Sequence, residues 1–434
     1  MSLWDEKIAA YDSEILMLWF VNLPLEVRYA VLAVVGLCAG AFANYLIYSW
    51  AYFPRHISPW APPHQDAPQR LALDRIPVLG WLGLKREREL HGRWFWIRPI
   101  LVELGVALML PALYWFETQS GGLLPTADRV PVLIAGFSSW GHSLFAVHAV
   151  LLLLMVAATF IDFDEQTIPD IITLPGTLFF LFVSTLPCLT WLPATVYWGD
   201  QFGTVETTFN VPWPFEAKWA EGTGLFTALT IWTTWCFALT ERHVVLRHGV
   251  YRALGYLCHG IRRNSNTKWL FGMWIIGVVA TMTLWFFGGD AWRGLLTSLV
   301  GLAVGGGAVW AVRIVASYAM GQEAMGFGDV TLMAMIGAMV GWQCAFAAFF
   351  LAPIVAILVV LVQFAITRQP AVPFGPYLCA GTAIAVLGWD VVWNQTLSQY
   401  VLMGDVLLWV LGSALLAMGV MLAVWRQIKR LLFA

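Results

Sequence analysis

The stretch AVLLLLMVAATFIDFDEQTIPD, residues 149–170, places a long apolar run directly before a cluster of acidic residues. Such a run is typical of a membrane-spanning helix, and an ionisable group at membrane depth is costly enough to be a functional candidate. The rest of the chain shares this character, because its 434 residues are 60% hydrophobic and 12% charged, against about 25% charged in a soluble domain. The sequence therefore predicts an all-α fold, a polytopic transmembrane helix bundle.

Apolar runs of about 20 residues, the length that crosses a bilayer, recur from end to end of the chain. They predict about 11 spans, of which the run at 224–240 and the division of 330–367 are marginal. The expected spans are 28–53, 99–116, 143–162, 171–194, 224–240, 269–287, 295–318, 330–341, 343–367, 374–392 and 402–425. Residues 1–27 have no basic start followed by an apolar core, so we expect no cleaved signal peptide.

The distribution of Lys and Arg predicts the orientation, because these residues accumulate in cytoplasmic loops. If the N-terminus is outside and the C-terminus cytoplasmic, 19 of the 24 basic residues lie inside, mainly in the loops 55–98 and 242–268. Two further loops, 163–170 and 319–329, then also lie on the cytoplasmic face, and both are next to acidic residues. The net charge of −2 and the lack of a basic cluster beside aromatic residues exclude a nucleic-acid partner.

The first of these loops carries Asp162, Asp164, Glu165 and Asp170. Asp162 follows the apolar run directly, so it is expected to lie within the bundle, whereas Asp164 and Glu165 are expected to meet water. Asp170 follows Pro169 at the start of the next span. Two interpretations of Asp170 stay open, as the residue that caps this helix or as part of a functional site.

The second loop ends in Gly326, Phe327, Gly328 and Asp329, before the apolar run VTLMAMIGAMVGW. Glycine allows backbone angles and close approaches that a side chain forbids, so a backbone of this kind can admit an extended peptide. Taken alone, Asp329 is better interpreted as a helix cap that faces solvent. With Asp162 on the same face, it becomes half of a candidate pair.

Two carboxylates brought together from separate helices can share one proton, with one acting as base toward a water and the other as acid. Asp162 ends a helix and Asp329 begins one, so the helix dipoles favour the proton on Asp162 and the charge on Asp329. Magnesium or calcium is a weaker interpretation, since no His or Cys stands near either loop and no DxDxDG pattern occurs. The glycines at 305–307 are better explained by close helix packing than by a phosphate loop.

Together these residues resemble the type IV prepilin peptidases, polytopic aspartic proteases with a GxGD motif. FIDFDEQTIPDIITLPG (160–176) resembles the family's first aspartate motif, and MGFGDVTLMAMIGAMVGW (325–342) resembles its GxGD motif. Weaker similarity lies in GAFANYLIY (40–48), RIPVLGWLGL (75–84), RPILVELGVAL (98–108), LVGLAVGGGAVW (299–310) and PFGPYLCAG (373–381). The resemblance covers residues 30–190 and 295–392.

The resemblance implies an endopeptidase that removes the leader peptide of type IV prepilins or pseudopilins at the cytoplasmic face of the bacterial inner membrane. It assigns Asp162 and Asp329 as the catalytic pair and Gly326 and Gly328 as the glycines of the active-site loop. The expected partners are prepilin substrates and the lipid bilayer. The expected fold is a family core of about 8 spans plus an inserted helix pair and a C-terminal span.

Some residues depart from the family pattern. Many relatives bind zinc through two CxxC pairs in the first cytoplasmic loop, which here has no cysteine, so we expect no metal. The resemblance links that loop to N-methylation of the mature N-terminus, so this second activity is doubtful here. S-adenosylmethionine is expected as a cofactor only if the methyltransferase activity is retained. Thr331 stands where a lysine is usual.

The same comparison predicts the domain organisation. Residues 1–27 form an extracytoplasmic segment, 28–116 a first region of two spans and a loop, 143–392 the peptidase core and 402–434 an extra span with a tail. An insertion at 197–294 interrupts the core. Two other functions stay open: an ion- or proton-coupled transporter that uses the same acids, and an inactive assembly factor of a secretion system.

Overall fold

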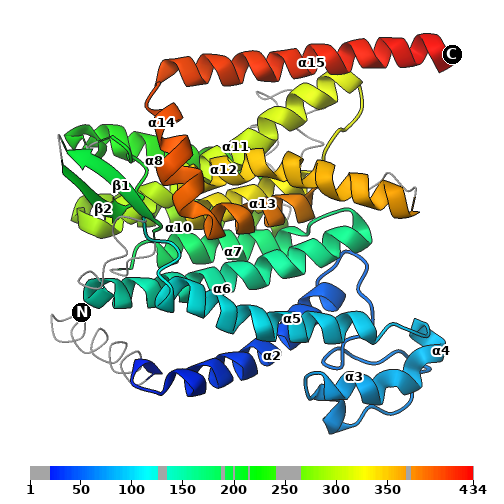
Figure 1. Ribbon diagram of the computed structural model, residues 1–434. Helices are drawn as coiled ribbons and strands as arrows, with labels where there is room; N and C mark the ends of the chain where they lie inside the picture. Colours follow the sequence, from blue (N-terminus) through cyan, green and yellow to red (C-terminus); the bar gives the residue numbers. More distant parts are fainter. Residues whose placement is uncertain are drawn as a thin grey trace. The chain divides into compact units, whose positions relative to one another are not determined.

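The computed structural model describes residues 20–125, 134–186, 191–198, 201–213, 216–240, 265–367 and 373–433. Within them the chain is almost entirely helical, as expected (Figure 1). The elements are α2 Leu25–Ser49, η1 Ala72–Arg75, α3 Leu79–Gly83, η2 Leu84–Glu87, α4 Arg88–His91, α5 Ile97–Tyr114, η3 Trp115–Gln119, α6 Ile134–Glu165, α7 Asp170–Val183, β1 Pro193–Trp198, β2 Gln201–Glu206, η6 Ala217–Trp219, α8 Gly222–Ala238, α10 Ser265–Phe287, α11 Gly289–Met320, α12 Phe327–Thr367, α13 Gly375–Leu387, η7 Asp390–Leu397, α14 Ser398–Val401 and α15 Asp405–Phe433. Most of the N-terminal segment 1–27 and of the basic loop 242–268 lies outside the described residues.

Seven of the described helices are long and apolar enough to cross a membrane, and an eighth span results if one bent pair is counted. The chain is therefore an integral membrane protein. The seven are Leu25–Ser49, Ile97–Gln119, Trp140–Glu165, Thr267–Phe287, Gly289–Met320, Phe327–Val362 and Asp405–Leu431. The bent pair joins Gly375–Leu387 to Asp390–Val401 at an angle of 78°.

The difference from the 11 expected spans arises where helices are short or broken. The expected span 171–194 is only 14 residues of helix, α7, and 224–240 is the 17-residue α8. The runs 330–341 and 343–367 belong to the single element α12, in which Gly341 has a non-helical backbone with φ 77°. The length of an apolar run reflects composition alone. It does not show where a glycine interrupts a helix, or where a helix ends before the apolar run does.

The chain divides into two compact units, one of residues 1–120 and 148–157 and the other of 121–147 and 158–434. In the first unit α2 packs directly against α5. Methyl groups at Gly36 and Gly40 would lie 2.6 Å from the Cα atoms of Ala107 and Glu103, so only glycine permits this approach. The buried Asn44 side chain joins the same helices by donating to Pro99 O at 2.9 Å and Glu103 Oε1 at 3.1 Å.

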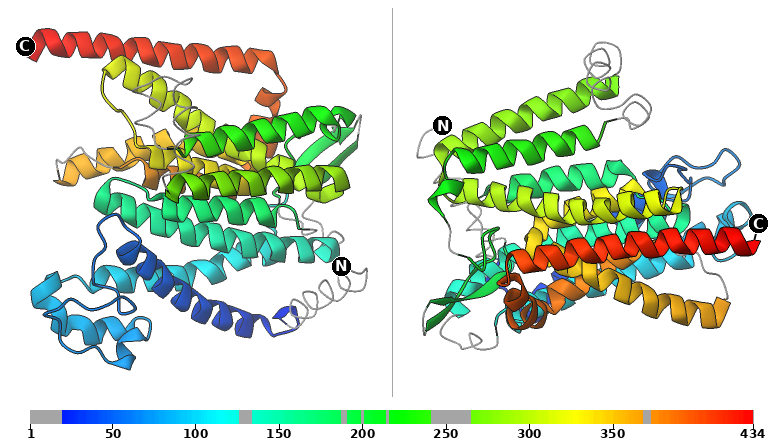
Figure 2. Two further views of the ribbon diagram at one scale, coloured as in Figure 1. Left: turned by 180° about the vertical axis from the view of Figure 1, so that it is seen from behind. Right: turned by 90° about the horizontal axis from the view of Figure 1, so that it is seen from above.

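The second unit is built around α11 and α12, which lie side by side in Figures 1 and 2. A methyl group at Gly301 would overlap the carbonyl of Gly337, and one at Gly337 would overlap the carbonyl of Gly301. The helices can approach this closely because both residues lack a side chain, as in other membrane helix pairs. The predicted packing role of the glycines at 305–307 holds for Gly305, which adjoins Met333, whereas Gly307 faces open space.

Replacing Gly301 with alanine is expected to destabilise the protein, because the added methyl group must force two packed backbones apart. Overpacking of this kind costs about 1–3 kcal/mol, and occasionally more. The matched control is Gly307→Ala in the same helix, where a methyl group meets nothing within 4 Å. Thermal unfolding in detergent measures the difference, and equal midpoints for the two variants would contradict this account of the α11–α12 contact.

A two-stranded hairpin, absent from the sequence-based prediction, follows α7. Strands β1 and β2 pair antiparallel, with Pro193 opposite Glu206. The turn after the hairpin contacts α12 near its break: Gln343 donates to Thr208 O at 2.7 Å and Trp342 Nε1 donates to Phe209 O at 2.7 Å. These bonds join the predicted insertion to the helix that begins with the GxGD motif.

Glu206, at the end of β2, makes the stability of this region depend on pH. Burial raises the pKa of Glu206 to about 7, against the lowering effects of the Trp191 backbone N–H and the Arg293 charge. Among the described residues, its Oε1 is buried without a hydrogen-bond partner. Because the unfolded chain releases this proton near its ordinary pKa of 4.5, the folded state loses stability as the pH rises from 4.5 to about 7.

Glu206→Gln is expected to remove that loss, which amounts to roughly 3 kcal/mol at most. The variant should unfold at a higher temperature than the wild type above pH 7, and at a similar temperature near pH 4. Thermal unfolding across this pH range provides the measurement. Glu216→Gln is the control, because the Glu216 side chain is 56% exposed, and the same pH response in both variants would rule out a particular role for Glu206.

Candidate active site

Asp162 lies in the last turn of α6 and is buried, with 3% of its surface exposed. Ala158, one turn earlier on the same face, and the preceding residue Ile161 are fully buried, whereas Phe163 is 50% exposed. The helical period therefore turns the Asp162 side chain inward, as expected. Asp164 and Glu165, which were expected to meet water, are half-buried.

Asp329 lies in the first turn of α12 and is 7% exposed. In the sequence Asp329 follows Asp162 by 167 residues. The two carboxylates lie close enough for their charges to interact, and Cys379 of α13 is within electrostatic range of both. The structure thus brings together the two acids that the sequence proposes as a pair.

Asp162 has a backbone donor from a third helix. The N–H of Gly375, the first residue of α13, donates to Asp162 Oδ2 at 3.0 Å. A methyl group at Gly375 would lie 2.5 Å from the same oxygen, so a side chain there would displace the carboxylate. Gly375 lies in the segment PFGPYLCAG but has no role in the site expected from the sequence, although a glycine followed by a helix-starting proline is the signal that could have indicated it.

Ile168, in the loop between α6 and α7, packs between the starts of α12 and α13. It is 3% exposed. A methyl group at Gly328 would lie 2.7 Å from Ile168 O, and one at Gly375 would lie 2.7 Å from Ile168 Cδ1. The loop after Asp162 therefore touches the helices that carry Asp329 and Gly375. Nothing in the sequence marks this isoleucine, because it reads as one apolar residue in a short loop.

The two glycines of the motif differ in their surroundings. Gly328 is pressed against Ile168, whereas a methyl group at Gly326 would meet only Asp329 Oδ2, at an ordinary contact distance of 3.7 Å. Gly326 belongs to the exposed loop between α11 and α12. Arg313 of α11 holds this loop by donating from Nε to Met325 O at 2.8 Å and from Nη2 to Glu323 at 3.1 Å.

Asp170 is the first residue of α7, and Pro169 occupies the N-cap position before it. The structure therefore places Asp170 one residue beyond the cap position expected from the sequence. Thr331, which is two residues after Asp329, has its hydroxyl 3.5 Å from Asp170 Oδ1 and donates to Gly328 O at 3.1 Å. Asp170 thus lies beside the start of α12, at the edge of the candidate site.

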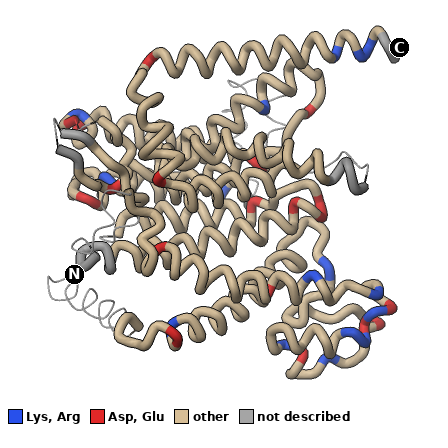
Figure 3. The backbone as a smooth tube through the Cα atoms, in the orientation of Figure 1, with Lys and Arg blue, Asp and Glu red and all other residues tan. Residues whose placement is uncertain are grey.

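The loop between α2 and α5 does not fit the zinc site that the resemblance brings with it, because it contains no cysteine. Two ion pairs join its parts instead. Arg70 binds both oxygens of the buried Glu87 at 2.9 and 2.8 Å, and Arg86 binds Asp74. Burial opposes ionisation of Asp74, but its bonds from Arg86 and the Leu71 N–H hold its pKa below the ordinary value. Figure 3 shows that Lys and Arg residues gather in this region.

No group of three or more His, Cys, Asp or Glu side chains that could hold a metal ion occurs among the described residues. The candidate site consists of two carboxylates, a backbone N–H and a buried isoleucine. Two carboxylates of this kind can move a proton to and from a water and a peptide bond without other groups.

Comparison with protein families matches residues 262–362 to the type IV leader peptidase family. This segment includes Gly326, Gly328 and Asp329, whereas Asp162 and Gly375 lie outside it. The match confirms the resemblance that the motifs indicate. No solved structure matches the chain significantly.

Several curated proteins called prepilin leader peptidase/N-methyltransferase are similar to the chain. The protein from Pseudomonas putida is 32% identical over 148 residues, which are 33% of this chain and 49% of that protein. Those from Stutzerimonas stutzeri and Pseudomonas aeruginosa are 34% and 32% identical, over 21% and 24% of this chain and 33% and 36% of their own lengths. The chain thus matches about half or less of the length of each relative, and its residues 262–362 match the type IV leader peptidase family.

Proposed function

We propose that this chain is a membrane-embedded aspartic endopeptidase that cleaves the leader peptide of type IV prepilins or pseudopilins. The observation that carries the proposal is the pair of buried carboxylates, Asp162 and Asp329, which interact from two different helix ends. The family match and the relatives named prepilin leader peptidase/N-methyltransferase support the substrate class.

In the proposed reaction one carboxylate takes a proton from a water, whose oxygen attacks the carbonyl carbon of the scissile peptide bond. The other carboxyl group gives its proton to the departing amine as the C–N bond breaks, so the pair ends with the same total of protons. The hydrogen bond from the Gly375 N–H fixes one oxygen of Asp162. Such positioning matters because the reacting atoms must be held in a narrow range of geometries.

The position of the acids in their helices suits a substrate that is itself a membrane helix. Asp162 is three residues from the end of the span Trp140–Glu165, and Asp329 is the third residue of the span Phe327–Val362. Both acids are therefore at helix ends and not near midplane, where ion-coupled transporters place their binding sites. This placement favours cleavage at the membrane interface over transport.

We further propose that the chain resides in the bacterial inner membrane, with the N-terminus outside and the C-terminus cytoplasmic. The excess of Lys and Arg in the loops assigned to the cytoplasm supports this orientation. Cleavage then takes place at the cytoplasmic face, with prepilins and the bilayer as partners. The proposal does not extend to N-methylation, and it requires neither a metal nor S-adenosylmethionine.

The test is to express the full chain, together with a type IV prepilin, in bacteria that lack a prepilin peptidase of their own. Mass spectrometry of the pilin should show loss of the leader, and no loss with an Asp162→Asn/Asp329→Asn double variant. The same spectrum reports a methyl group on the new N-terminus. An intact leader with every prepilin tried would refute the peptidase proposal and favour an inactive assembly factor.

A further inference from the structure

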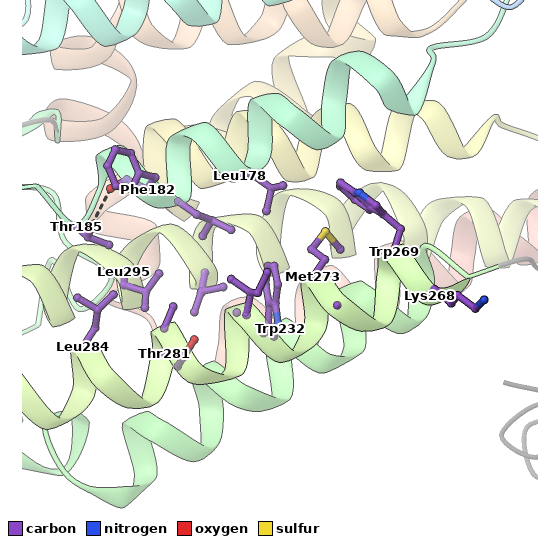
Figure 4. Close-up of a pocket in the computed structure, with 16 residues that line it drawn as sticks. Leu178, Phe182, Thr185, Trp232, Lys268, Trp269, Met273, Thr281, Leu284 and Leu295 are labelled. Atoms are coloured by element: carbon purple, nitrogen blue, oxygen red, sulfur yellow. Dashed lines mark hydrogen bonds between the residues drawn. The ribbon is translucent and has the colours of Figure 1, made fainter. Parts of the chain in front are cut away.

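A groove of about 770 Å³ lies between α7, α8, α10 and α11 (Figure 4), and neither Asp162 nor Asp329 is among the residues that line it. Its lining is apolar apart from two threonines and Lys268, and it includes Leu178, Trp232, Met273 and Leu295. Two of its four walls, α8 and α10, come from the predicted insertion at 197–294. The groove is therefore formed where the insertion meets the rest of the second unit.

The groove exists because α10 is held by α8 and leaves its other side open. A methyl group at Gly277 would overlap the Trp232 ring, and Trp232 Nε1 donates to Trp274 O at 3.0 Å. These contacts fasten α10 to α8. A methyl group at Gly272, in contrast, meets nothing within 4 Å, so the groove has free space beside this residue.

The surroundings of the groove indicate what can fill it. Helix α10 crosses the membrane with only 11% of its most apolar window buried inside the protein, so lipid surrounds it. The cation Lys268 stands at one end of the groove, whereas Leu284 and Thr185 lie toward the other (Figure 4). The groove thus has an apolar body and a positively charged end.

The groove is too small to enclose a whole transmembrane helix. A helix of 20 residues is about 30 Å long and 10–12 Å wide, which corresponds to roughly 2,400–3,400 Å³. This exceeds the 770 Å³ of the groove several times. A hydrocarbon chain of a lipid is thin enough to lie in an apolar groove of this volume.

We propose that the groove binds one acyl chain of an anionic phospholipid, whose headgroup lies at Lys268. Apolar burial would hold the chain, and the charge of Lys268 would select the headgroup. The proposal gives the insertion a role as part of a lipid-binding site. It is independent of the peptidase activity, because none of its residues belongs to the candidate active site.

The experiment uses the full chain, purified in detergent with phosphatidylglycerol or phosphatidylcholine of identical acyl chains and analysed by native mass spectrometry. The wild type should retain phosphatidylglycerol in preference. Lys268→Gln should lower its retention about fivefold, the effect of one basic residue near an anionic surface. Gly272→Phe should fill the free space and abolish the retained lipid.

Gly412→Phe is the matched control, because Gly412 lies in the membrane helix α15, has nothing within 4 Å and is far from the groove lining in sequence. It should retain lipid like the wild type. If Gly272→Phe does not fold, Gly272→Leu and Lys268→Gln carry the test. Equal retention of both lipids by the wild type, or unchanged retention in the folded groove variants, would overturn the proposal.

Discussion

Asp162→Asn and Asp329→Asn are each expected to slow leader cleavage by about 10³-fold, within the range that acid–base groups contribute. Asparagine has nearly the shape of aspartate but neither gives nor takes a proton, so each variant removes one of the two proton transfers. Cleavage of a purified prepilin by the reconstituted variants measures the loss. The double variant should be scarcely slower than either single variant, because groups that act as a unit show non-additive effects.

The control for this prediction is Asp164→Asn. Asp164 is two residues from Asp162 in the same helix but is only half-buried, so its replacement should leave cleavage near the wild-type rate. If Asp164→Asn lowers the cleavage rate as much as Asp162→Asn does, the negative charge of this helical turn is what matters, and not the pair of acids. Losses that multiply in the Asp162/Asp329 double variant would show that the two acids act independently.

The two acids could be found from the sequence because each one follows or precedes an apolar run. Asp162 ends a run, Asp329 begins one, and the distribution of Lys and Arg assigns both to one face. This is enough to propose a pair. Their approach in space depends on the contacts among α6, α12 and α13, which the sequence does not show.

Gly375 and Ile168 illustrate what the sequence could not supply. Gly375 is 213 residues from Asp162, and its role depends on where α13 begins. The helix dipoles favour the proton on Asp162, but the N–H of Gly375 also donates to this carboxylate and favours its charged form. The assignment of the proton stays a prediction, to be tested by titrating the pair.

The membrane bundle could likewise be predicted from composition, but its spans could not be counted from it. Gly341 interrupts α12 with a φ of 77°, and the apolar run after α7 turns into a hairpin. The side chains around Gly341 are as apolar as in a span, and the expected span 171–194 ends where the hairpin begins. Hydrogen bonding decides whether the chain continues as a helix there. The strands of the hairpin pair their backbone groups with each other, and Gln343 donates to the Thr208 carbonyl, so these polar groups are satisfied without a helix.

Gly328→Ala is expected to lower the cleavage rate about 100-fold, which is the typical cost of displacing a catalytic group by about 1 Å. The methyl group would lie 2.7 Å from Ile168 O and 2.9 Å from Ile168 N and Cβ. Because these are mainly backbone atoms, no side-chain rotation relieves the overlap. The loop that follows Asp162 must move away from α12, and the distance between the two carboxylates must change with it.

Gly326→Ala provides the matched control within the same motif, since its methyl group would meet only Asp329 Oδ2 at 3.7 Å. Its cleavage rate should remain near that of the wild type, with both variants equally folded by thermal unfolding. This result would show that Gly328 is needed for close packing against Ile168, whereas Gly326 is not. If Gly326→Ala loses as much activity as Gly328→Ala, the need lies in the backbone freedom of the whole loop, and the contact with Ile168 is not what positions Asp162 against Asp329.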